Sequence, residues 1–92
     1  MTTDRNDATI RLQEGAAVWR EMDGETVVLA LDSSEYLGLN RTATTLWPAI
    51  VEGTTRDALV GRLVDAFEIE EDRAVADVDA FVETCRSRGL LA

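Results

Sequence analysis

The chain has 92 residues, 46% of them hydrophobic, which is enough for the core of one small domain without disulfides or a metal. Nine arginines, no lysine and eighteen acidic residues make a net charge of −9, which disfavours binding to nucleic acid or to an anionic membrane. The single cysteine excludes an internal disulfide, and the lack of histidine removes the commonest general base and metal ligand.

Residues 1–8 are polar and charged, and we expect a disordered tail there, followed by a single domain over residues 9–92. The tail lacks the apolar segment of a secretory signal, and no apolar run approaches the ~20 residues that span a bilayer. These features predict a cytoplasmic protein whose partners are neutral or basic peptides or proteins rather than nucleic acid or membrane.

Three strands are predicted in the first half of the chain. Thr9–Leu12 alternates briefly as a short lead-in strand, and residues 16–21 form the first longer one. Asp23-Gly24 is typical of a type I′ hairpin turn, which leads into an apolar second strand over residues 25–31. After a turn at residues 32–34, Glu35–Leu39 is the third strand. The pattern predicts a three-stranded meander.

Three helices are predicted after the strands, which makes the fold class α+β. Asn40 or Thr42 is a plausible N-cap for the first, and Pro48 lies inside its apolar pattern. Either this helix begins late, with Pro48 in its first turn, or it kinks there. Thr55 begins the second helix, and the acidic run 70–72 begins the third.

The residues favour no enzyme and no cofactor. Cys85 lies on the apolar stripe of the third helix and is predicted to be a buried core thiol. The acidic run 70–72 is explained by the helix N-terminus without a metal. The glycines are scattered and form no phosphate-binding loop.

The ordered set of motifs resembles the PqqD family, whose small domain is called the RiPP recognition element. The resemblance covers about residues 16–91 and rests on an apolar hairpin strand, a strand ending in Leu-Asn, a helix start with tryptophan, a Gly-Thr turn and a terminal Gly-Leu. In this sequence these are residues 27–29, Tyr36–Asn40, Thr42–Trp47, Gly53–Thr55 and Gly89–Leu91. Pro48, directly after the tryptophan, departs from the family pattern.

The resemblance implies a winged-helix-like fold without catalysis that binds the leader segment of a ribosomally made precursor peptide. A stand-alone chain of this length most resembles the recognition proteins of lasso peptide pathways. The implied partners are then the precursor peptide, a leader peptidase of the cysteine-protease type and a cyclase.

Strand addition would place the peptide on the edge of the third strand, at Glu35, Tyr36, Leu37, Gly38 and Leu39. The family resemblance makes the third helix the other wall of the groove. At 100° per residue, one flank of that helix is more apolar than the other, and it predicts peptide contacts from Val75, Asp79, Val82 and Arg86. The alternative is that Val75 and Val82 only widen the core stripe.

Two rival functions remain open from the sequence. A winged-helix DNA-binding or regulatory domain would need an outward-facing basic helix, and the second helix offers only Arg56 and Arg62. A small subunit that binds only an enzyme is not separated from leader binding by these residues.

Overall fold

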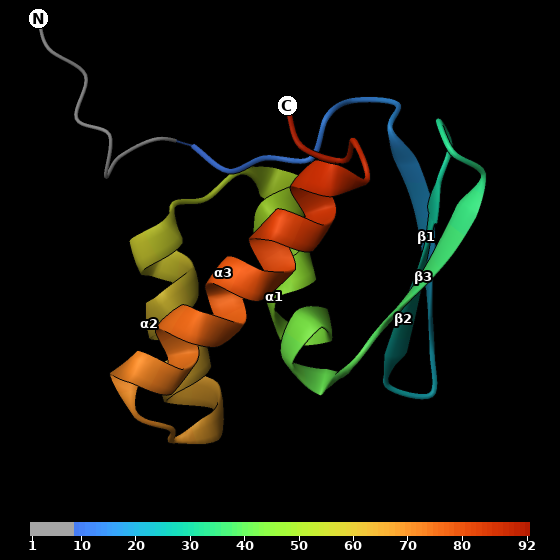
Figure 1. Ribbon diagram of the computed structural model, residues 1–92. Helices are drawn as coiled ribbons and strands as arrows, with labels where there is room; N and C mark the ends of the chain where they lie inside the picture. Colours follow the sequence, from blue (N-terminus) through green and yellow to red (C-terminus); the bar gives the residue numbers. More distant parts are fainter. Residues whose placement is uncertain (1–8) are drawn as a thin grey trace, which may run out of the picture.

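The computed structural model describes residues 9–92, so the predicted disorder of residues 1–8 lies outside it. Three strands are followed by three helices, which confirms the predicted α+β order (Figure 1). The strands are β1 (Ala17–Met22), β2 (Glu25–Ala30) and β3 (Glu35–Leu39), and the helices are α1 (Arg41–Glu52), α2 (Arg56–Phe67) and α3 (Glu71–Ser87).

The strands form an antiparallel sheet in the order β1-β2-β3. Asp23 and Gly24 have φ angles of 51° and 80°, so both central residues of the first turn have the positive φ of the predicted type I′ hairpin. The lead-in segment makes isolated bridges instead of joining this sheet, because Ile10 pairs with Thr54 and Leu12 pairs with Leu91. The lead-in segment thereby contacts the residues that follow α1 and α3.

Local capping decides where the helices begin. Asn40, one of the two predicted caps, starts α1 by accepting a hydrogen bond from the Ala43 N–H at 2.8 Å. Thr55 caps α2 in the same way through the Ala58 N–H at 3.2 Å. Pro48 lies inside α1, which runs on from Arg41, so the helix does not begin late.

The helices cover only one face of the sheet, and the core lies between the two layers (Figure 1). Trp47 is almost completely buried there, and its ring meets that of Trp19 edge-on with centroids 5.5 Å apart. The other face of the sheet has no helix packed against it among the described residues.

Candidate functional site

β3 lies at an edge of the sheet, with β2 on one side and no other described strand on its open side. This confirms the prediction that the third strand is an edge strand. In an antiparallel ladder, alternate residues direct their N–H and C=O groups away from the neighbouring strand. The open side of β3 therefore offers a row of hydrogen-bonding groups to another strand.

A groove of about 330 Å³ lies between α3 and the point where β3 passes into α1. We call it the edge groove, and its lining residues are Asn40, Thr42, Ala43, Arg73, Asp77, Ala80, Phe81 and Thr84. Phe81 is mostly buried and supplies an apolar floor, while the rim carries hydroxyl, amide and charged groups. Such a lining can take an apolar side chain and hydrogen-bond its polar neighbours.

An ion pair ties the other end of β3 to the C-terminal end of α3. The Arg88 guanidinium donates a hydrogen bond from Nη1 to Glu35 Oε1 at 2.6 Å. Both side chains are partly exposed, so the pair contributes little to stability. It does show that the first residue of β3 lies near the C-terminal end of α3.

The predicted β3 residues divide between the two faces of the sheet. Leu37 and Leu39 turn toward the helices, and Leu39 is buried. Tyr36 is 73% exposed, and together with Gly38 it lies on the face away from the helices. A strand added beside β3 would therefore meet an apolar row on one face and a tyrosine on the other.

The predicted helix flank does not adjoin β3. Val75 lines a different hollow together with α2, and the Asp79 carboxylate accepts two hydrogen bonds from the Arg56 guanidinium of α2, at 2.7 and 2.9 Å. The hydrogen bond from Arg56 lowers the pKa of Asp79 below its ordinary value. These two residues thus face α2, on the opposite side of α3 from the edge groove.

The other two predicted helix residues are also outside the edge groove. Val82 is only 7% exposed and belongs to the core, as the alternative reading held. Arg86 lies near Glu83 of its own helix, with Nη1 to Oε2 at 3.8 Å. Leader contact by these four residues stays a prediction, which the geometry of β3 and α3 does not support.

The flank that faces the start of α1 carries Arg73, Asp77, Ala80 and Thr84, and Arg88 just beyond the helix reaches Glu35 of β3. In the sequence, Asp77, Thr84 and Arg88 form the polar flank of this helix. The more apolar flank was therefore predicted to contact the peptide instead. Helical angles give the flanks but not which one faces the sheet. The opposite charges of Glu35 and Arg88, at the ends of their elements, were the signal in the sequence that could have identified the flank nearer to the sheet.

Chemically reactive groups are scarce in the described residues. Cys85 is buried, and this burial raises the pKa of its thiol from 9.0 to about 12, so it is a neutral core group near pH 7. No cluster of acidic or cysteine side chains in residues 9–92 is arranged to hold a metal ion. None of the three helices is long and apolar enough to cross a bilayer.

The fold is a small domain with a three-stranded sheet, an open β3 edge and three helices, and a family match agrees with the sequence resemblance. Residues 25–91 match the model of the coenzyme PQQ synthesis protein D family, PqqD. This protein belongs to the PqqD family. No curated protein sequence matches it significantly.

Two solved structures share the fold. One is TbiB1 in complex with the TbiA(beta) leader peptide, with a TM-score of 0.79 and 22% identity over 88% of this chain and 93% of that one. The other is a lasso peptide synthetase B1 complexed with the leader peptide, with a TM-score of 0.75 and 26% identity over 89% of this chain and 95% of that one.

Proposed function

We propose that this protein binds the leader segment of a ribosomally made precursor peptide, by adding it as a strand to the open edge of β3. The observation that carries the proposal is the open side of the edge strand β3, whose first residue is ion-paired with Arg88 at the end of α3, in a PqqD-family fold. Two similar solved structures are complexes with leader peptides. The pathway is that of a lasso peptide.

Backbone hydrogen bonds from Glu35–Leu39 supply affinity, because they form with any extended peptide. Side chains supply the choice of peptide. Inward-facing leader side chains meet Leu37 and the edge groove, where Phe81 offers an apolar floor and Asp77 and Thr84 offer polar partners. The flank of α3 that selects the leader is therefore the polar one.

The protein acts without catalysis of its own, in the cytoplasm, and delivers the leader to a peptidase of the cysteine-protease type and to a cyclase. The lack of histidine and the raised pKa of its one thiol support a binding role. The net charge of −9 supports peptide and protein partners over nucleic acid.

The DNA-binding alternative is not favoured. Within α2, Arg56 is occupied by Asp79, and the exposed acids Asp57 and Asp65 lie on the same helix as Arg62. A recognition helix needs a basic outer surface to approach phosphates.

Titration with synthetic leader peptides, encoded by short reading frames beside the gene, tests the proposal. We expect one leader to bind with micromolar or tighter affinity, and Ala80→Trp to raise its Kd at least tenfold by filling the edge groove. Ala80 is exposed, so the variant should fold. Fluorescence polarisation with a labelled leader measures both.

Ala66→Trp is the matched control, because Ala66 is an exposed helical alanine on α2 outside the edge groove. Its Kd should stay within twofold of the wild type. A wild-type Kd for the Ala80→Trp variant would refute the groove assignment. Failure of every leader to bind the wild type would refute the function itself.

A further inference from the structure

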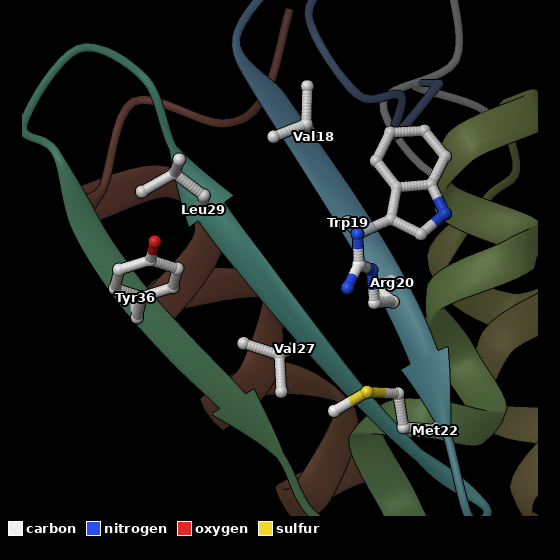
Figure 2. A pocket seen from close by; sticks show the side chains of 7 residues that line it. All are labelled: Val18, Trp19, Arg20, Met22, Val27, Leu29 and Tyr36. Carbon is white, nitrogen blue, oxygen red and sulfur yellow. The ribbon is translucent and has the colours of Figure 1, made fainter.

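The face of the sheet that points away from the helices carries an apolar surface, which we call the outer face. Its side chains are Val18, Arg20 and Met22 of β1, Val27 and Leu29 of β2, and Tyr36 of β3 (Figure 2). A shallow hollow of about 450 Å³ lies over them. Trp19 also borders the hollow, but its ring turns toward Trp47 in the core. Because β3 is an edge strand, the outer face extends to the edge where the leader is proposed to bind.

One position of the outer face, on the edge strand, carries no side chain. The register aligns the residues of this face in rows that cross the strands. In one row, Val18 pairs with Leu29 and Leu29 pairs with Tyr36, so every strand contributes a side chain. In the neighbouring row, Val27 pairs with Gly38. This second row therefore ends in a gap at the β3 edge, beside the ring of Tyr36.

Neither the backbone nor the packing of the described residues requires a glycine at this position. Gly38 does not have the positive φ of Gly24 in the hairpin turn. A Cβ added at Gly38 would meet nothing within 4 Å. Glycine weakens a strand, because it loses more conformational freedom on folding and offers no side chain for packing. A strand glycine also marks places where a ligand approaches closely. The gap therefore suits a bound peptide better than it suits the free domain.

A leader strand on the β3 edge would direct one of its side chains over this gap. Paired residues of neighbouring strands point to the same face of a sheet, so the leader residue beside Gly38 points to the outer face. Its backbone lies about 4.8 Å from β3 and about twice as far from β2. A small side chain would leave the gap empty. A bulky side chain that lies flat across the glycine reaches Val27.

The surroundings of the gap select the chemistry of that side chain. Tyr36 lies two residues along β3, about 6.8 Å away, and is 73% exposed. Val27 is half-buried on the other side. These neighbours favour an apolar group, because a charged one would lose water without gaining a partner. We propose that Gly38 selects leaders with a bulky apolar residue beside it, an inference that rests on the proposed function.

Gly38→Val tests the inference, because valine suits a strand and fills the gap. The variant should melt at or above the wild-type temperature, and its leader Kd should rise at least tenfold by fluorescence polarisation. Gly61→Val is the matched control, because a Cβ at this exposed glycine of α2 also meets nothing within 4 Å. Its leader Kd should stay within twofold of the wild type.

An alanine scan of the leader separates the loss of this contact from a general change in β3. One bulky apolar leader residue, replaced by alanine, should raise the Kd of the wild type at least tenfold and that of Gly38→Val less than twofold. Leader residues that enter the edge groove should lose affinity equally with both proteins. Because side chains alternate between faces along a strand, the residue over Gly38 should lie an odd number of positions from these.

Tyr36→Thr provides a second protein variant, because it removes the exposed ring beside the gap and keeps a residue that suits a strand. It should raise the Kd of the natural leader at least threefold and leave that of the alanine-substituted leader within twofold.

Three results would overturn the inference. Wild-type leader affinity in Gly38→Val, or equal losses in both proteins for every scanned residue, would do so and leave the proposed function intact. Loss of a wild-type dimer in Gly38→Val, seen by sedimentation, would assign the gap to a second copy of the chain. If no leader binds the wild type, the inference and the proposed function fail together.

Discussion

Thr26 is the one buried polar residue in the core of the described chain, and its hydroxyl makes no hydrogen bond there. A buried polar group without a partner costs about 1–3 kcal/mol. Its methyl group packs well on the inner face of β2, which explains why a β-branched residue suits the position. Cys85 is also buried. Because burial raises the pKa of its thiol, the thiol stays neutral and contributes to packing in the core.

Thr26→Val should raise the free energy of unfolding by about 1 kcal/mol, because valine keeps the shape and removes the unpaired hydroxyl. Urea denaturation measures this. Thr45→Val is the control, since the exposed Thr45 hydroxyl donates to the Arg41 carbonyl at 2.9 Å, and it should change stability by less than about 0.5 kcal/mol. A destabilised Thr26→Val variant would show that the hydroxyl has a partner.

Pro48 interrupts the backbone hydrogen bonding of helix α1. It is exposed within α1 and has no N–H to donate to the Thr44 carbonyl one turn earlier. Exposure lets water take the place of the missing donor at that carbonyl. The buried residues Leu46, Trp47 and Ile50 hold the helix in place on either side. Packing thus overrides the low helix propensity of proline.

Pro48→Ala should raise the free energy of unfolding by about 1–2 kcal/mol, because it restores the hydrogen bond and removes the ring clash, less a small gain in the entropy of the unfolded chain. Thermal and urea unfolding measure the change. Leader affinity should stay within twofold, because Pro48 is not part of β3 or the edge groove. An unchanged or lower stability would mean that α1 is already adapted to the proline.

The two-layer arrangement of residues 9–92 leaves two kinds of feature open: the edge strands β1 and β3, and the face of the sheet away from the helices (Figure 1). The molecule is thin, with extents of 36, 34 and 19 Å, and none of residues 9–92 forms a third layer over the sheet. Both features require the folded sheet, because an unfolded chain has neither an ordered edge nor aligned rows of side chains.

The leader should therefore stabilise the folded state by mass action. At a free leader concentration of 100 times Kd, the free energy of unfolding should rise by about 2.7 kcal/mol. For a domain of this size the melting temperature then rises by roughly 10–20 °C, since each kcal/mol shifts it by about 4–8 °C. Differential scanning fluorimetry measures the shift. A scrambled leader of the same composition should give a clearly smaller shift, because it keeps the backbone hydrogen bonds and loses the matched side-chain contacts. An equal shift from both peptides would contradict the choice of leader by side chains.

The sequence by itself determined the element order, because hydrophobic period and capping residues act locally. The hairpin at Asp23-Gly24, the strand Glu35–Leu39 and the start of the third helix were all predictable for this reason. The meander order also followed, since short turns join neighbouring strands. The family resemblance, carried by the same local motifs, was confirmed by the match over residues 25–91.

Only the tertiary structure decided which flank of α3 lines the edge groove. The helical angle separated Val75 and Asp79 from Asp77 and Thr84, but their placement depends on how α2 and α3 pack together. The pairing of Arg56 with Asp79 and of Arg88 with Glu35 joins residues 23 and 53 positions apart. The outer face likewise emerged only from the register of three strands, since no local pattern says which side of a sheet the helices leave uncovered.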